Sequence, residues 1–360
     1  MSGKKEFIPN KLPIKINMSN NLYKALNTAS RSLGELNGFI KTIPNQNILI
    51  NSLVLQEAKD SSEIENIITT HDDIFIAQIN DNKIARNTKE VINYEKALKL
   101  GFELIQKDKL LLNRHILSIQ KILQSNNAGF RTQSGTTLKN PTTGEIKHIL
   151  PQHIDNINEL MDNLQNYIND ELDDLDPLIR IAIIHYQFET IHPFYDGNGR
   201  TGRIINVLYL TKMGLLDLPI LYLSAYIIQN KTKYYELLEN VSKNNDWEDW
   251  ILYILVGINK TSIATIKLIK DIESSIQNFT SILKEEAPKI YSKDFVELLF
   301  SFAYTKIQSV EEKLNISRQT ASKYLKTCEE LGLLRCIKLN NMSYYVNLSL
   351  FEILKKGIVC

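Results

Sequence analysis

The residues best suited to chemistry lie within one short segment, His192 to Arg203, which reads HPFYDGNGRTGR. Three of the 14 glycines of the chain fall between positions 197 and 202 of this segment. Glycines at this density, just before the helical pattern of residues 204–210, allow backbone N–H groups to turn toward an anion at a helix N-terminus. The segment therefore predicts a binding site for phosphate groups.

The side chains around these glycines fit the handling of a nucleoside triphosphate. Arg200 and Arg203 are three positions apart, so they share a helix face and are predicted to clamp a polyphosphate from one side. Asp196 offers hard oxygen atoms of the kind that Mg²⁺ prefers. His192 is the nearby group that can accept a proton near neutral pH.

The other interpretations of the segment have less support from the sequence. Gly197, Gly199 and Gly202 match the dinucleotide-binding fingerprint, but that fingerprint follows a strand, whereas a helix beginning at Asp176-Pro177 precedes this one. No Walker A sequence is present, so a P-loop is excluded. A helix start with two solvated arginines and a structural histidine would be the plain alternative. The clustering of base, carboxylate, glycines and arginines argues against it.

The segment resembles the signature of Fic-domain adenylyltransferases, HPFx(D/E)GN(G/K)RxxR, at every fixed position. The resemblance implies that His192 deprotonates a hydroxyl of a target protein, which attacks the α-phosphate of ATP. It also implies that Asp196 holds Mg²⁺ on the phosphates while pyrophosphate leaves. The residues implied to bind the nucleotide are Gly197, Asn198, Gly199, Arg200, Thr201, Gly202 and Arg203.

The contacts to adenine and to the target are less closely defined by the signature. Gln229 or Asn230 is predicted to bind the edge of the base, while Tyr226, Tyr234 and Tyr235 fit adenine contacts and core positions equally well. Residues 136–149 form a strand–turn–strand pattern in an otherwise helical chain. By resemblance, this hairpin is a flap that presents a target segment by strand addition.

A carboxylate interrupts an apolar helix face upstream of the signature. Within the helix predicted over residues 50–68, Glu65 shares a stripe with Val54, Ala58, Ser61 and Ile68. The sequence SSEIEN resembles the inhibitory motif (S/T)xxxE(G/N) of the same family, which implies that Ser61 and Glu65 are inhibitory and that Glu65 pairs with Arg203. The alternative is a half-exposed Glu65 that pairs with Lys59 or water.

The C-terminal segment has a different character. Residues 289–360 carry 11 Lys and Arg against 7 Asp and Glu, a net charge of +4. Two short helices, the second capped by Ser317, precede two strand-like runs, which resembles a winged helix. The second helix would read DNA through exposed side chains or bind a protein, and both uses stay open. The exposed side chains predicted for it are Arg318, Gln319, Ser322 and Lys323.

These elements predict a mainly α fold: a Fic helical core with a β-hairpin flap and a small C-terminal winged-helix (α+β) domain. The expected domains are an N-terminal helical region (1–105) with the inhibitory motif, the catalytic core (106–258), a helical connector (259–288) and the winged helix (289–360). The predicted function is an auto-inhibited protein adenylyltransferase that acts on Ser, Thr or Tyr of a target and on itself. The alternatives are removal of AMP through Glu65, and a nucleotide-sensing transcription regulator.

The composition is that of a globular protein and does not indicate a particular binding partner. The chain has 360 residues, with 23% charged and 43% hydrophobic residues and a net charge of +1, so any attraction to nucleic acid must be local. Its three cysteines, Cys328, Cys336 and Cys360, do not form a disulfide framework. No signal peptide is recognisable, and the apolar run around Ile181 is too short to span a bilayer. We expect a cytoplasmic protein without a membrane partner; a homodimer stays open.

Overall fold

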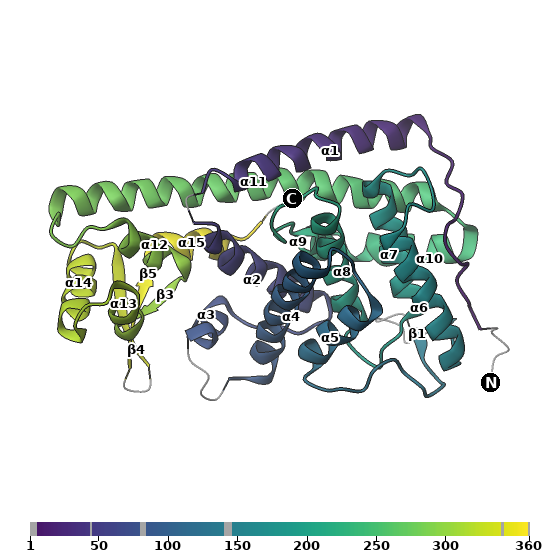
Figure 1. Ribbon diagram of the computed structural model, residues 1–360, viewed down its shortest axis with the longest axis horizontal. Coiled ribbons are helices and arrows are strands. Elements are labelled where there is room, and N and C mark those ends of the chain that lie inside the picture. Colours follow the sequence, from purple (N-terminus) through teal and green to yellow (C-terminus); the bar gives the residue numbers. More distant parts are fainter. Residues whose placement is uncertain (1–5, 44, 80–83, 140–145, 340–341, 359–360) are drawn as a thin grey trace.

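The computed structural model describes residues 6–43, 45–79, 84–139, 146–339 and 342–358. The protein is mainly helical, as predicted, with two small antiparallel sheets among the described residues. Helices α1 and α11 lie side by side along the length of the molecule, and the remaining elements lie below them in the view of Figure 1.

The N-terminal region is helical. Ser19 caps the first helix by accepting a hydrogen bond from the Leu22 amide, and Asn45 caps the second in the same way from the Asn47 amide. The bounds of these helices are α1 (Asn20–Ile40), α2 (Gln46–Ile64), α3 (His71–Ile79), α4 (Arg86–Asp108) and α5 (Asn113–Gln124).

Helix α2 is shorter than the predicted helix over residues 50–68. It ends at Ile64, Glu65 is its C-cap residue, and Asn66 adopts a left-handed conformation with φ of 62°. Ile68 is 67% exposed and lies outside the helix, so the predicted stripe stops at Glu65. The side chain of Glu65 therefore sits at the end of a helix, where the chain direction changes.

The centre of the bundle is formed by two consecutive helices that are buried on nearly all sides. Asp176 caps α7 by accepting a hydrogen bond from the Leu178 amide at 2.8 Å, with Pro177 as the first helical residue, as predicted. Helix α8 follows α7 after a six-residue connection and packs against it and against α4. The helices of this part are α6 (Ile154–Asn169), α7 (Pro177–Ile191), α8 (Asn198–Lys212), α9 (Leu223–Gln229) and α10 (Lys231–Asn244).

The predicted hairpin is present as two short strands, β1 (Thr137–Lys139) and β2 (Ile146–Ile149), paired antiparallel. Its predicted turn lies outside the described residues. The N-terminal segment continues this small sheet, because Glu6 bridges Ile149 in parallel and the Phe7 amide donates to the Ile149 carbonyl at 2.7 Å. The hairpin is thus attached to the start of the chain.

Helix α11 (Trp247–Glu286) runs without a break across the predicted boundary at residue 258, so the connector is not a separate element. Helix α4 likewise crosses the predicted boundary at residue 105. Among the described helices, α11 alone is long and apolar enough to cross a membrane, but 61% of its most apolar window is buried inside the molecule. A buried core helix can have the same length and apolar composition as a membrane span. The packing of α11 along α1, α7 and α9 is that of a core helix.

The C-terminal unit follows the order helix, strand, helix, helix, strand, strand, helix. Its three-stranded sheet has the order β3-β5-β4, and the first of these strands was absent from the sequence prediction. Ser317 caps α14 by accepting from the Thr320 amide, as predicted. The elements are α12 (Lys293–Ser301), β3 (Tyr304–Lys306), α13 (Ile307–Leu314), α14 (Arg318–Glu330), β4 (Leu334–Leu339), β5 (Met342–Asn347) and α15 (Leu348–Lys356).

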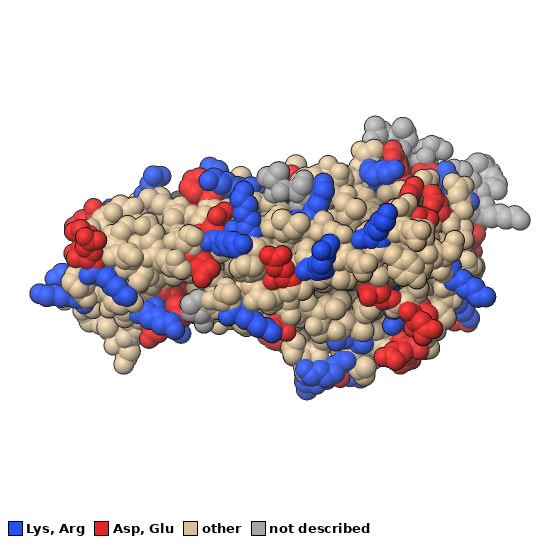
Figure 2. All heavy atoms as spheres, turned by 90° about the horizontal axis from the view of Figure 1, so that it is seen from above, with Lys and Arg blue, Asp and Glu red and all other residues tan. Residues whose placement is uncertain are grey.

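Charged side chains are distributed evenly over the face seen in Figure 2. Lysines and arginines alternate with aspartates and glutamates along this face, and no large patch of one sign forms there. This distribution agrees with the net charge of +1. Any selective binding of anions on that face must therefore come from local geometry.

Candidate active site

His192 follows the last residue of α7 and is held there by backbone geometry. It adopts a left-handed conformation with φ of 51°, and its amide donates to the Phe188 carbonyl at 3.0 Å. The Nδ1 atom lies 3.3 Å from the Glu189 carbonyl oxygen. Because a carbonyl can only accept, Nδ1 carries the proton and Nε2 has the free lone pair. Burial lowers the pKa of His192 to about 4, so the ring is neutral at pH 7.

Arg131 supports the loop that begins at His192. Its side chain is fully buried, its Nε donates to the His192 carbonyl at 2.8 Å, and its NH2 group donates to the Pro151 carbonyl. The backbone of Arg131 also donates to the Pro193 carbonyl at 2.8 Å. Sequence analysis assigned no role to Arg131. The structure makes it the link between the flap and the signature loop.

The signature loop is folded back on itself at the start of α8. The Asn198 side chain accepts from the Phe194 amide at 2.9 Å and donates to the Phe194 carbonyl at 2.8 Å. Gly197 has φ of 76°, a conformation that favours glycine. A Cβ atom at Gly199 would collide with the Glu65 carboxylate. The Glu65 carboxylate thus lies over the predicted phosphate cradle at the N-terminus of α8, where the helix dipole favours an anion.

Glu65 also pairs with Arg203, as the resemblance implied. Arg203 NH2 donates to Glu65 Oε1 at 2.9 Å and to the Ser61 carbonyl at 2.9 Å, while Arg203 Nε donates to Ser61 Oγ at 2.7 Å. Burial acts to raise the pKa of Glu65, but the charge and hydrogen bond of Arg203 outweigh it and lower this pKa. The alternative partner Lys59 pairs with Asp60 and Glu63 instead.

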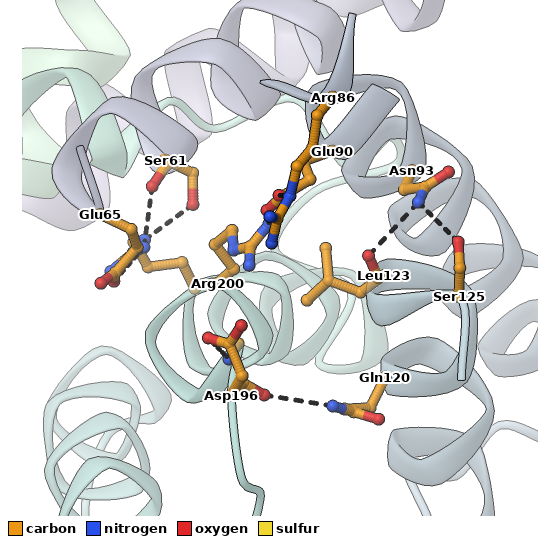
Figure 3. Close-up of polar contacts among 12 residues, drawn as sticks. Ser61, Glu65, Arg86, Glu90, Asn93, Gln120, Leu123, Ser125, Asp196 and Arg200 are labelled. Carbon is orange, nitrogen blue, oxygen red and sulfur yellow. Dashed lines mark hydrogen bonds and ion pairs between the residues drawn. The ribbon is translucent and has the colours of Figure 1, made fainter. Parts of the chain in front are cut away.

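Arg200 does not join Arg203 in a common clamp in this structure. Arg200 NH1 donates to Glu90 Oε2 of α4 at 3.0 Å, and the Arg200 side chain is 2% exposed. The two predicted phosphate-binding arginines thus have different carboxylate partners, Glu65 for Arg203 and Glu90 for Arg200. Figure 3 shows Glu90 on one side of Arg200, and Ser61 and Glu65 on the other. Sequence analysis missed Glu90.

Asp196 is an exposed carboxylate near the start of α8. Its Oδ1 accepts from the Gly197 amide at 2.6 Å, and its carbonyl accepts from the Gln120 side chain at 3.2 Å. No group of three or more His, Cys, Asp or Glu side chains in the described residues could hold a metal ion. A lone exposed carboxylate nevertheless fits Mg²⁺, because this ion usually takes one or two protein carboxylates together with phosphate oxygens and water.

Glu57 is a buried carboxylate that fixes α2 to its neighbours, and sequence analysis missed it as well. Tyr94 of α4 donates to Glu57 Oε1 at 3.2 Å, and both the amide and the hydroxyl of Ser224 of α9 donate to the Glu57 carboxylate. Burial raises the pKa of Glu57 to about 8. Its position two turns before Glu65 means that it sets the path of the helix that delivers Glu65.

The remaining predicted contacts are placed as follows. Gln229 donates to the Ile358 carbonyl at 3.0 Å and Asn230 to the Tyr226 carbonyl at 2.9 Å, so both side-chain amides are bound to backbone carbonyls in this state. Tyr234 is buried against His185, and Tyr235 is 37% exposed. Thr201 and Gly202 lie on the buried side of α8. An adenine contact through Gln229 would require it to exchange its partner.

Three family descriptions match successive parts of the chain. Residues 23–103 match the Fic/DOC family N-terminal region, residues 109–210 the Fic/DOC family, and residues 276–350 the C-terminal domain of protein adenylyltransferase SoFic-like. The second range contains the whole signature segment, and the first contains Glu65 and Glu90.

Curated relatives carry the same description. The chain is 26% identical over 217 residues to protein adenylyltransferase fic-1 of Caenorhabditis briggsae, which covers 58% of this chain and 37% of the relative. It is 27% identical over 150 residues to the Caenorhabditis elegans protein of the same name, covering 41% of this chain and 24% of the relative. The chain thus spans well under half the length of these relatives.

Solved structures share the fold. A Fic family protein from Desulfovibrio desulfuricans G20 superposes with a TM-score of 0.57 at 19% identity, covering 92% of this chain and 97% of that one. A Fic domain containing signaling protein from Bacteroides thetaiotaomicron VPI-5482 superposes with a TM-score of 0.54 at 18% identity, covering 70% and 97%. At these identities the likeness concerns the fold.

Proposed function

Because the chain belongs to the Fic/DOC family, we propose that it is a protein adenylyltransferase, which transfers AMP from ATP to a hydroxyl of a target protein. The observation that carries this proposal is the neutral His192, whose Nε2 is free beside the glycine-rich start of α8. A base next to an anion cradle suits nucleophilic attack on a phosphate.

In the proposed reaction, the hydroxyl oxygen of the target forms a bond to the α-phosphorus, and the bond from that phosphorus to the bridging oxygen breaks. The hydroxyl proton passes to His192 Nε2, and pyrophosphate carries away the bond electrons. Asp196 would hold Mg²⁺, which neutralises charge on the phosphates. The backbone N–H group of Gly199, together with Arg200 and Arg203, would bind the phosphate oxygens, and the N–H group of Gly197 would join them once it releases Asp196.

Autoinhibition is part of the proposal. The Glu65 carboxylate occupies the space over Gly199 and engages Arg203, so a triphosphate must displace it to bind in the productive position. Glu65 is the C-cap residue of α2 and its side chain is 35% exposed, so it can leave without unfolding the helix. A target segment would then add to the β1–β2 hairpin, beside residues 6 and 7.

Intact-protein mass spectrometry tests this proposal directly. After incubation of the chain and a cell lysate with ATP and Mg²⁺, we expect AMP to be added to protein, and more strongly with the Glu65→Gly variant. His192→Ala is the matched control: it should bind nucleotide but transfer nothing, because loss of a general base costs about 10²–10⁴ in rate.

The outcomes also separate the rival functions. Loss of AMP from a previously modified protein, with no addition, would favour removal of AMP with Glu65 positioning the water. Nucleotide binding with neither addition nor removal would favour a sensor. Either result would replace the transferase proposal.

We also propose that α14 is a contact surface. The lining of a surface hollow along this helix includes Arg318, Lys323 and Lys326 together with Glu330, so basic side chains outnumber acidic ones there. The net charge of +4 on residues 289–360 can neutralise only a few phosphates, so DNA binding should be weak and should have a shallow salt dependence. Fluorescence anisotropy with duplex DNA at two salt concentrations checks this. Binding in the nanomolar range at physiological salt would favour the transcription regulator.

A further inference from the structure

Arg200 is a buried cation with an incomplete set of partners. Its NH1 group donates to Glu90 Oε2 at 3.0 Å, whereas its Nε atom is buried without a hydrogen-bond partner among the described residues. The residue as a whole is 1% exposed. This guanidinium lies at the start of the signature helix and has an unused N–H donor. It can therefore donate a hydrogen bond to a further acceptor, such as a phosphate oxygen.

Glu90 is held from its outer side as well. The Arg86 guanidinium, whose side chain is 90% exposed, donates through Nε to Glu90 Oε1 at 3.3 Å. Figure 3 shows Glu90 between Arg86 and Arg200. Oε1 of Glu90 therefore accepts a hydrogen bond from Arg86, and Oε2 accepts one from Arg200. The remaining donors of Arg200 are not used by Glu90.

Helix α4, which carries Glu90, is held in place by its packing, whereas Glu65 lies at the end of α2. Val91, Tyr94, Ala97 and Leu98 are fully buried, and a Cβ atom at Gly101 would collide with side chains of α5 and α8. Helix α4 thus packs against α8 with no room to withdraw. Glu65 differs, because it ends α2 and precedes a left-handed residue. A carboxylate on a fixed helix should remain beside Arg200 when a nucleotide binds.

We propose that Glu90 is a positioning residue that holds the Arg200 guanidinium in place so that its free donors bind an outer phosphate of the nucleotide. The inference rests on the proposed function, since it assumes a triphosphate at the N-terminus of α8. Glu90 touches neither the phosphate nor the reacting atoms; it restricts the rotamers of Arg200 and neutralises part of its buried charge. Its effect therefore depends on the outer phosphates and is absent for AMP.

The test is nucleotide affinity of the full chain in the Glu65→Gly background, where the cradle is open. Isothermal titration with ATP and with AMP gives the two dissociation constants for the parent, Glu90→Ala and Glu90→Gln. Glu90→Ala should raise the Kd for ATP on the order of tenfold, because a hydrogen bond to a charged group is lost. Glu90→Gln retains an acceptor oxygen and should raise it less. The Kd for AMP should stay unchanged in both.

Arg86→Ala is the matched control. It removes the exposed guanidinium from Glu90 and leaves the Arg200 contact intact, and an exposed ion pair contributes little. The Kd for ATP should therefore change by less than about twofold. Melting temperatures show whether each variant folds. If Glu90→Ala does not fold, a rise in the Kd for ATP alone in Glu90→Gln carries the test.

Two results would overturn the positioning role. Tighter ATP binding in the Glu90 variants would make Glu90 a second inhibitory carboxylate, and an unchanged ratio of ATP to AMP affinity would make it a purely structural residue. If the Glu65→Gly parent binds no ATP, the proposed function fails together with the inference. These outcomes are distinguishable because nucleotide binding is measured before any transfer.

Discussion

At the scale of single residues, the site is controlled by how each charge is compensated. His192 is neutral because burial removes its proton, and its Nδ1 is directed to a backbone carbonyl. Arg203 and Arg200 are both buried, and each has a carboxylate partner from the N-terminal region. In the proposed reaction, a triphosphate would offer the arginines alternative anions, so its binding would compete with Glu65 and leave Glu90 in place.

The pKa of His192 predicts the pH dependence of transfer. A general base acts in its neutral form, and a pKa of about 4 means that this form prevails at every pH well above 4. The rate of the Glu65→Gly variant should thus stay nearly constant from pH 8 down to about pH 5 and fall only below it. An ordinary histidine would lose half its activity near pH 6.5. Initial rates with α-labelled ATP across this range check the prediction, and a midpoint near 6.5 would contradict it.

Replacing Glu65 should activate the enzyme. Glu65→Gly removes the carboxylate from above Gly199 and frees Arg203, so transfer to protein, including the chain itself, should rise by at least about tenfold, the gain expected when one charged competitor is removed. Arg203→Ala should remain inactive even in combination with Glu65→Gly, because the phosphate contact itself is lost. Incorporation of α-labelled ATP by both single variants and the double variant measures this. Equal rates for Glu65→Gly and wild type would remove the inhibitory role.

At the scale of elements, local patterns predicted much of what positions the site. The Asp176-Pro177 start of α7, the Ser317 cap of α14 and the hairpin pattern all agree with the structure, because caps, prolines and alternation act over a few residues. Strand β3 was missed because three residues are too short for a periodic pattern. The end of α2 was placed too late, since Asn66 alone marks the left-handed turn.

The missed carboxylates have a common explanation. Glu90 looks like the partner of Arg86 at i, i+4 on an exposed helix, and nothing local reveals that Arg200 lies beside it. Yet Glu90 shares a helical stripe with Tyr94, Ala97 and Gly101, all buried. The argument that identified Glu65, a carboxylate on an apolar stripe, would have identified Glu90 as well. Pairing across 110 positions of sequence, in contrast, depends on tertiary packing.

The carboxyl group that anchors α2 should make stability depend on pH. Burial raises the pKa of Glu57 to about 8 from the ordinary value of 4.5, so the folded protein binds a proton that the unfolded chain releases between these values. The favourable contribution of Glu57 to the free energy of unfolding is complete below pH 4.5 and is lost as the pH rises through 8. Glu57→Gln mimics the protonated form and lacks this loss. Thermal unfolding at pH 5, 7 and 9 should show the variant gaining stability relative to wild type as pH rises; a constant difference would contradict the shift.

At the scale of the whole molecule, the C-terminal unit packs on α2, the helix that is capped by Glu65. The Gln56 side chain of α2 donates to the Leu354 carbonyl of α15 at 2.6 Å, and Tyr304 of β3 donates to Asp72 of α3 at 2.5 Å. Figure 1 shows this unit below one end of α11, next to α2 and α3. Contacts made by α14 with a partner could therefore reach Glu65 through the body of the C-terminal unit and α2.

An aromatic cluster at this interface offers the test of such coupling. Phe75 of α3 is 2% exposed, and its ring centroid lies 6.0 Å from Tyr304 and 5.8 Å from Phe351. Phe75→Ala should cost about 3–5 kcal/mol of stability, as expected for a buried phenylalanine. If the interface restrains α2, the same change should raise basal transfer severalfold in the wild-type background. It should add nothing in the Glu65→Gly background, where the inhibitory carboxylate is already absent.

The control for this prediction is Phe279→Ala. Phe279 is equally buried and packs on Phe300 between α11 and α12, so its loss should lower stability by a similar amount without touching α3. General loosening of the fold would raise transfer in both variants, whereas coupling through α3 and α2 raises it in Phe75→Ala alone. Transfer rates are compared at a temperature at which both variants are folded. A Phe75→Ala rate equal to that of wild type would mean that the C-terminal unit is attached to α2 without restraining it.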